Sequence, residues 1–351
     1  MAKTNKRGAA PSEKDATGII RELPMACVDE QTAVEFVERQ RWGDHPMCAH
    51  CGNANVYQMR DRKTGQRSKR YLWRCNECRD QFTVRIGTIF EDSRIPLKHW
   101  CYAFWAACAG KKGVSALQIR RQTQISYKSA LFMMHRIRYV MTPNTPQPPL
   151  RGKVEVDETY VGGRARPREI NEWRQMRRMK RMGQRPTRTN DKMPVVAMVE
   201  RGGSVRAQVM PTVTAHNVRK LLAENVSLEA HLRTDESGLY TKVGRPFASH
   251  ETVKHSLFEY VRGDASTNTV ESFFSRLKRQ LYGTHHAVSK EHLHRYVAEV
   301  VFKHNTRKLD DGERVREAFK MSVGKRLRYE EPVKRQGTDG PNRTQTIGPI
   351  A

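Results

Sequence analysis

The sequence predicts an α/β protein in which a zinc ribbon and a helix-turn-helix precede a larger domain with a mixed sheet. Three observations support this class. Two Cys-x-x-Cys pairs stand in the first quarter of the 351 residues, a helical stretch with a short break follows, and short apolar runs ending in acidic residues fill much of the second half. A chain of this length is long enough for two or three domains with their own hydrophobic cores.

The chain is strongly basic, with 64 Lys and Arg against 37 Asp and Glu and a formal net charge of +27. This charge favours a polyanionic partner, because each Lys or Arg that neutralises a phosphate releases condensed counterions. Nucleic acid is the first candidate and a membrane surface the second. No apolar run is long enough to span a bilayer, and no apolar signal-peptide core follows the basic N-terminus. We therefore expect a cytoplasmic protein with reduced cysteines that are available for metal.

Residues 1–22 are predicted to form a disordered basic tail, and residues 23–95 a helix followed by the zinc ribbon. The two cysteine pairs are 23 residues apart, and each short turn places two thiolates about one tetrahedral Zn²⁺. Four unrelated reduced cysteines are the alternative, which the paired spacing disfavours. We predict one structural zinc ion, with Cys48, Cys51, Cys75 and Cys78 as its ligands.

The loop between the cysteine pairs carries six basic side chains, a pattern that suits contacts with DNA phosphates. A solvated loop without a partner is the alternative. The six residues are Arg60, Arg62, Lys63, Arg67, Lys69 and Arg70, and we take Arg70 as a candidate DNA-binding residue.

Residues 96–142 are predicted to form a helix-turn-helix region. Residues 115–122 and the residues from Tyr127 onward form two helical patterns with a short break between them. Because the second helix of this motif enters the major groove through its N-terminal residues, Tyr127, Lys128 and Ser129 are candidate DNA contacts. A plain helical bundle is the alternative. The proline-rich residues 143–149 mark the end of this region.

Residues 150–310 are predicted to form the second domain. A strand at 154–160 is followed by a basic insertion at 164–192, which is either a phosphate clamp or a solvated loop. A hairpin at 195–209 and a helix at 215–226 follow. After them come a short strand that carries Asp235, a further strand at 253–256 and a last helix from about 266. This order is that of a ribonuclease H-like mixed-sheet catalytic domain. Residues 325–351 read as a flexible tail.

Three acidic residues of this domain stand on three separate elements. Asp157 lies on the first strand, Asp235 ends a later strand, and Glu271 lies on the last helix. Each residue alone has an ordinary explanation as a turn cap or a surface acid. Together they supply the oxygen ligands that a hard divalent cation requires, and two such ions clamp the attacking and leaving oxygens of a phosphoryl group.

From about residue 36 to residue 308 the chain resembles the zinc-ribbon group of bacterial insertion-sequence DDE transposases, which carry an ISXO2-like transposase domain. The similarity rests on the cysteine pairs and on the segments 156–163, 234–237 and 267–279. It implies that Asp157 and Asp235 bind the metals and that Glu271 completes the site. Some members have Asn as the last ligand, so Asn268 is a rival, although a carboxylate suits a hard cation better.

The resemblance also implies roles for residues beyond the carboxylates. Lys278 occupies the place of a basic residue two helical turns after the acid and would hold a phosphate or a flanking base. His285 and His286 would lie near the scissile strand. Two Mg²⁺ or Mn²⁺ ions per site are expected as cofactors.

The implied function is transposition of an insertion sequence. Metal-dependent cleavage at the terminal inverted repeats would free a 3′ hydroxyl, which then attacks target DNA without a covalent enzyme intermediate. Double-stranded DNA is the expected partner, with a homo-oligomer assembled on it, no membrane, and a nucleoid location in a bacterial cytoplasm. A catalytically silent DNA-binding regulator and a structure-specific nuclease are the alternatives. The presence of all three acids favours the enzyme.

Overall fold

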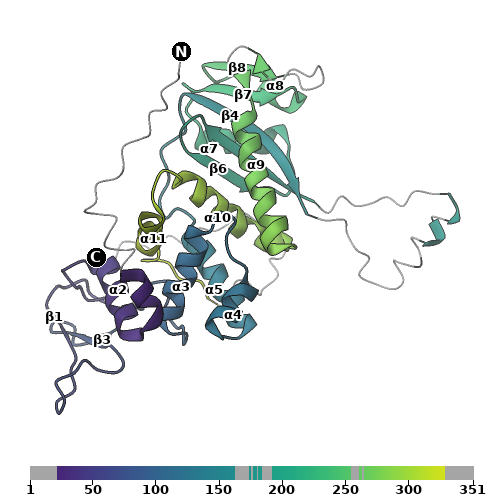
Figure 1. Cartoon of the computed structure of the whole chain (residues 1–351). Helices are drawn as coiled ribbons and strands as arrows, with labels where there is room; N and C mark the ends of the chain where they lie inside the picture. Colours follow the sequence, from purple (N-terminus) through teal and green to yellow (C-terminus); the bar gives the residue numbers. More distant parts are fainter. Residues whose placement is uncertain are drawn as a thin grey trace, which may run out of the picture.

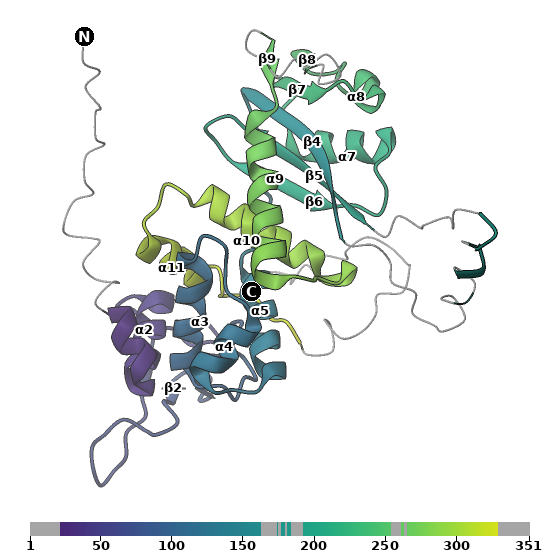
Figure 2. The ribbon, with the colours of Figure 1, turned by 45° about the vertical axis from the view of Figure 1, so that its right-hand side comes forward.

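The computed structural model describes residues 22–162, 174, 177–179, 181–183, 192–253, 261–262 and 265–328. Most of the predicted basic insertion and most of both predicted tails lie outside these residues. The described chain forms a small N-terminal ribbon, a helical region and a sheet with helices on both faces (Figures 1 and 2).

The ribbon is a three-stranded antiparallel sheet of β1 (Val56–Gln58), β2 (Trp73–Cys75) and β3 (Gln81–Phe82). Its interior contains Trp73, Phe82 and the buried cysteines of the two pairs. The ribbon is tied to the helix α2 (Glu30–Trp42) by Glu38, which accepts a 2.7 Å hydrogen bond from Trp73 Nε1 and pairs with Arg67. Arg67 is therefore an internal side chain, and its predicted phosphate contact is wrong.

The helical region contains α2, α3 (Leu97–Ala109), α4 (Ala116–Thr123) and α5 (Tyr127–Val140), together with α11 (Asp311–Lys320) from the end of the described chain. Its core is apolar and aromatic, and Phe104 of α3 stacks on Phe319 of α11 with ring centroids 4.4 Å apart. Helix α2 begins after Asp29, whose side chain accepts a 2.8 Å hydrogen bond from Thr32 N and caps the helix.

The start of the predicted C-terminal tail packs against this region. Lys325 is buried and donates hydrogen bonds to the backbone carbonyls of Tyr139 and Val140 at the end of α5. Leu327 joins the same apolar core. The prediction of a flexible tail is therefore wrong for residues 325–328, because the ammonium group caps the unpaired carbonyls of a helix end.

The second domain is built on five described strands in the spatial order β6-β5-β4-β7-β8. Strand β5 pairs antiparallel with β4 and β6, whereas β4, β7 and β8 run parallel. This arrangement confirms the ribonuclease H-like mixed sheet. The strands are β4 (Lys153–Val161), β5 (Met193–Glu200), β6 (Val205–Val209), β7 (His231–Asp235) and β8 (Ser249–Val253).

The last strand of this sheet differs from its prediction. Strand β8 ends at Val253, where the predicted strand began, and residues 254–256 lie outside the described part of the chain. Two short strands, β9 (Val261–Arg262) and β10 (Ala265–Ser266), pair with each other before the last long helices.

Helices cover both faces of the sheet. One face packs against α7 (Ala215–Asn225) and α8 (Gly238–Val243), and the other against α9 (Asn268–Gln280) and α10 (Leu293–Asn305). Alternation along β4 decides which residue faces which layer: Val154 and Val156 belong to the α7 side, whereas Val161 belongs to the α9 side. The odd-numbered residues of β4 therefore face α9.

Candidate active site and zinc centre

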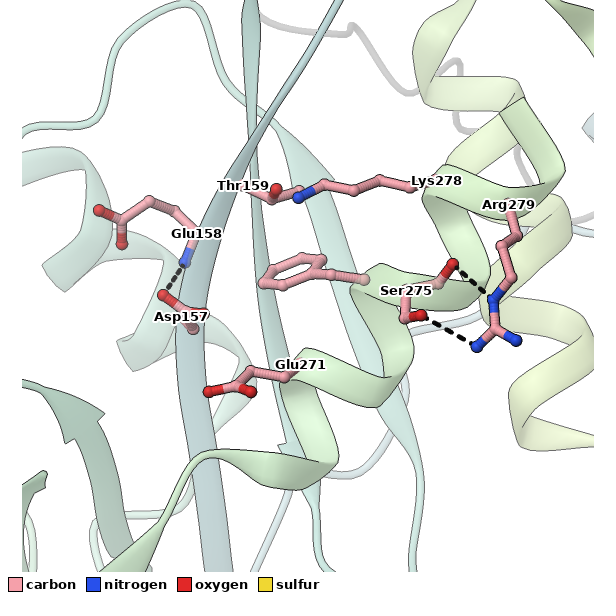
Figure 3. A pocket seen from close by; sticks show the side chains of 8 residues that line it. Asp157, Glu158, Thr159, Glu271, Ser275, Lys278 and Arg279 are labelled. Atoms are coloured by element: carbon pink, nitrogen blue, oxygen red, sulfur yellow. Dashed lines mark hydrogen bonds between the residues drawn. The ribbon is translucent and has the colours of Figure 1, made fainter. Parts of the chain in front are cut away.

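Strand β4 and helix α9 form an open pocket of about 450 Å³ (Figure 3). Asp157 reaches it from β4, and Glu271 from the first turn of α9. Lys278 follows two helical turns later on the same face of α9. The lining residues are Asp157, Glu158, Thr159, Glu271, Phe274, Ser275, Lys278 and Arg279.

Asp235 is brought to Asp157 by strand pairing. Strand β7 runs parallel to β4 with Arg233 opposite Glu155, and two further residues along each strand lead to Asp235 and Asp157. The negative charge of Asp235 also affects the protonation of Asp157. Burial raises the pKa of Asp157 to about 7, and the charges of Asp235 and Glu271 contribute to the increase.

The charges of the three carboxylates favour a divalent cation between them. A carboxyl group that burial and three acidic neighbours keep partly protonated is stabilised in its charged form by a cation. Within the described part of the chain, neither Asp157 nor Asp235 has a Lys or Arg within salt-bridge distance. Asp157 and Glu271 line the pocket, whereas Asp235 is not among its lining residues. Among the described residues, only the four cysteines bring their ligand atoms close enough together to hold a metal as they stand.

Asn268 and Glu271, the two candidates for the third metal ligand, differ in their position relative to the pocket. Asn268 is the first residue of α9 and is exposed, but it is not among the residues that line the pocket. Glu271 accepts a 3.0 Å hydrogen bond from the Thr267 hydroxyl and does line it. The geometry therefore favours Glu271 of the two rivals.

Glu158 illustrates the alternation along β4. Its carboxylate accepts a 2.5 Å hydrogen bond from the Tyr240 hydroxyl of α8, on the face opposite α9. Burial raises the pKa of Glu158, and the charge of Asp235 adds to this effect. In Figure 3 its side chain points away from Glu271. Although Glu158 is among the residues that line the pocket, its carboxylate is held on the α8 side.

Glu155 is a residue that the sequence analysis missed. It is completely buried on the α9 side of β4, and it accepts hydrogen bonds of 2.8 and 3.0 Å from the backbone N–H groups of Thr269 and Val270. Arg201 completes the arrangement with a 2.7 Å ion pair to Glu155 and a hydrogen bond to Ser266. Glu155 thus satisfies the free N–H groups at the start of α9.

This arrangement fixes the helix that carries Glu271 to the strand that carries Asp157. The signal was present in the sequence, because a second acid stands two residues before Asp157 on the same face of the strand. What the sequence did not supply was the partner, since Thr269 lies 114 residues away along the chain.

The predicted zinc ligands form a compact cluster. The ligand atoms of Cys48, Cys51, Cys75 and Cys78 all lie within 4.8 Å of one another. The sulfurs of Cys48 and Cys78 are 3.6 Å apart, as are those of Cys51 and Cys75. Zn–S bonds of 2.3 Å imply about 3.8 Å between sulfurs at the corners of a tetrahedron, so the four cysteines fit one zinc ion.

The candidate DNA-binding residues lie apart from the carboxylates. Arg70 is exposed in the ribbon loop, and Tyr127 and Lys128 are exposed in the first turn of α5. Ser129 is half-buried. Ser126 caps the helix: its hydroxyl accepts a hydrogen bond from the Ser129 N–H and donates one to the Ser129 hydroxyl.

His285 is half-buried, and its predicted position near the scissile strand stays a prediction. Its ring packs on Tyr296 of α10 with centroids 4.8 Å apart, and burial lowers its pKa to about 4. Its neighbour His286 is exposed.

Within the described residues, no helix has the length and apolar character needed to cross a membrane.

The fold and the two centres define a zinc-ribbon protein with a ribonuclease H-like catalytic domain. Residues 149–305 match the family described as the ISXO2-like transposase domain, and residues 28–81 match the transposase zinc-ribbon domain. The chain is 31% identical over 273 residues to an uncharacterized protein in transposable element ISH50 from Halobacterium salinarum, covering 77% of this chain and 89% of that relative. The chain therefore belongs to the family of zinc-ribbon transposases with an ISXO2-like domain.

Proposed function

We propose that this protein transposes an insertion sequence by cleaving DNA at terminal inverted repeats and joining the freed 3′ hydroxyl to target DNA. The proposal rests mainly on one observation. Asp157, Asp235 and Glu271 come from three elements that are distant in sequence, and the charges of Asp235 and Glu271 act on Asp157. Two of these carboxylates, Asp157 and Glu271, line an open pocket, and such a set of acids suits phosphoryl transfer on a large substrate.

The carboxylates would hold Mg²⁺ or Mn²⁺, two ions per site, with Asp157 and Asp235 as ligands and Glu271 completing the set. When bound, such ions activate a water or hydroxyl nucleophile and stabilise the leaving oxygen. Lys278 lies in the same pocket, so its ammonium group would bind a phosphate oxygen beside the scissile bond. The cysteine-bound zinc would be structural, because its four ligands leave no open position.

The assembly follows from the reaction. Two DNA ends must meet before they are joined, so we expect the protein to act as a homo-oligomer on double-stranded DNA at the nucleoid.

The decisive experiment uses purified protein with Mg²⁺, a labelled DNA fragment carrying the terminal repeat of the flanking element, and a target plasmid. The same reaction is run with Asp235→Asn and with a matched control, Asp44→Asn, whose carboxylate is exposed on the loop after α2. We expect cleaved ends joined to the plasmid with the unmodified protein and with Asp44→Asn, and neither product with Asp235→Asn.

The alternatives predict other products. Binding without metal-dependent cleavage by any of the three proteins would indicate a DNA-binding regulator. Cleavage without joined products would indicate a structure-specific nuclease.

A further inference from the structure

Two segments of this basic chain contain no acidic residue at all. Residues 93–154 include 11 Lys and Arg but no Asp or Glu, and they form α3, α4 and α5. Residues 272–290 include four Lys and Arg but no acid, and they follow Glu271 along α9 into η2 (Leu281–His285). A surface built from these two segments is positively charged, because neither segment contains an acidic side chain that would offset its Lys and Arg residues.

Helix α4 presents a complete exposed stripe from the first segment. Leu117, Arg120, Arg121 and Gln124 stand at the spacing of one helix face, and all four are exposed, with Leu117 at 51%. The opposite side of α4 packs through Ala116 and Ile119. Neither arginine side chain has a salt bridge or hydrogen bond in the described chain.

Helix α5 does not present such a stripe. Eight of its 14 residues are buried, and both long faces are covered, by the helical core and by α10. Only its first turn, with Tyr127 and Lys128, is exposed. Only the first turn of α5 can reach a DNA groove, whereas α4 presents an exposed stripe along its whole length.

The loop before α4 joins the helical region to α9. The Thr284 hydroxyl of η2 donates a 3.0 Å hydrogen bond to the Lys112 carbonyl. The next residue, Gly113, has φ +71°, and a Cβ there would lie 2.4 Å from Glu299 Oε1 of α10. Figure 2 shows the C-terminal end of α9 beside the helical region.

A buried ion cluster makes this junction firm. Arg138 of α5 donates a 2.9 Å hydrogen bond to Glu299, and Lys303 pairs with the other Glu299 oxygen at 2.8 Å. Arg138 and Glu299 are 1% and 0% exposed. Such a pair is specific in geometry, because breaking it leaves an uncompensated buried charge. The α4 stripe therefore has a fixed position relative to α9.

We propose that the exposed stripe of α4, Lys112, and Lys278 and Arg279 of α9 together form one binding surface for duplex DNA. In this surface α4, rather than α5, lies against the groove. This inference rests on the proposed function and adds the path by which the DNA reaches the carboxylates. Lys278 and Arg279 continue the surface into the pocket itself. The 13 residues of α9 extend about 20 Å, so about six base pairs separate the Lys112 end from the acidic end.

The test measures DNA binding without cleavage. Full-length Asp235→Asn protein is titrated onto a fluorescent duplex of arbitrary sequence, about 30 base pairs long, over a series of salt concentrations. Onto this background we add Arg120→Gln/Arg121→Gln. The matched control is Arg219→Gln/Lys220→Gln, the same loss of charge at exposed positions of α7, on the other face of the sheet.

Each lost phosphate contact reduces the slope of log K against log salt by about 0.9. We expect the α4 pair to reduce the slope by about two and Lys112→Gln by about one, with no change in the α7 pair. Circular dichroism and zinc content establish that each variant is folded.

Three results would overturn the surface: equal slopes in the α4 and α7 pairs, an unchanged slope with Lys112→Gln, or a loss with Lys128→Gln that exceeds the loss with the α4 pair. The two proposals fail separately. A reduced slope in the α4 pair without any strand joining by the unmodified protein would retain the surface and remove the transposase function. Strand joining with an unchanged slope would remove only the surface.

Discussion

Glu271 and Asn268 lie three residues apart on α9, but only Glu271 lines the carboxylate pocket. If the site binds metal through Glu271, then Glu271→Gln should reduce cleavage by more than about 100-fold, because even partners outside the ligand set cost about 10–100-fold. Asn268→Ala should remain within a few-fold of the unmodified protein. Initial rates of Mg²⁺-dependent end cleavage measure both. The opposite ranking would make Asn268 the ligand.

The protonation of Asp157 gives a prediction about pH. Its pKa is about 7 in the folded protein against a usual 3.8, because burial and the neighbouring carboxylates disfavour the charge. Between these values the folded chain holds a proton that the unfolded chain has lost, so this residue's stabilising contribution falls as pH rises from about 4 to about 7. Asp157→Asn should lack this part of the decline.

Urea unfolding of both proteins without added Mg²⁺, at several pH values in that range, measures the difference. The zinc site is kept loaded throughout. Parallel pH profiles for the two proteins would show that Asp157 titrates normally.

At the scale of single elements, the start of α9 depends on Glu155. Glu155→Gln keeps the shape of the side chain but removes the charge that pairs with Arg201 and faces the positive end of the helix. We expect cleavage to fall by about 10–100-fold, as for other residues that orient metal ligands. The concentration of Mg²⁺ needed for half-maximal rate should rise as well.

A purely structural role for Glu155 would lower thermal stability without moving the Mg²⁺ requirement. Glu200→Gln is a suitable comparison, since Glu200 ends the neighbouring strand β5. An unchanged Mg²⁺ requirement in Glu155→Gln would contradict a positioning role.

The packing of whole helices also bears on the roles predicted for α4 and α5. The periodicity of α4 and α5 placed two helices correctly, but it assigned the groove-facing role to the second helix. Burial of α5 by α10 leaves only its first turn exposed, which is why we propose α4 for this role, and α10 begins more than 150 residues after α5 ends. The sequence of α5 alone therefore could not predict that α10 covers it.

At the scale of the whole molecule, the zinc centre should be separable from the carboxylate site. Cys75→Ser is expected to abolish stoichiometric zinc, because Cys75 is one of four sulfurs in the cluster and metal binding stabilises folding of such small modules. DNA binding should weaken while the ribonuclease H-like domain stays folded. Atomic absorption, DNA titration and circular dichroism measure the three effects.

Cys101→Ser is the matched control for Cys75→Ser, since Cys101 is a buried core thiol on α3 and lies outside the cluster. Full zinc content in Cys75→Ser would show that the four cysteines do not share one ion.

The sequence by itself determined the zinc ligands, the order of the second domain and three acids on three elements. These features depend on short-range spacing: a Cys-x-x-Cys turn and the alternation of a strand are set within a few residues. The identity of the chain as a family member followed from the same local motifs.

Only the tertiary structure decided how these pieces meet. The parallel pairing of β7 with β4 brings Asp235 beside Asp157, and Glu155 holds α9 from 114 residues away. The burial of α5 likewise depends on α10. These outcomes arise from packing and buried charge between distant segments, which the periodicity of one segment does not specify.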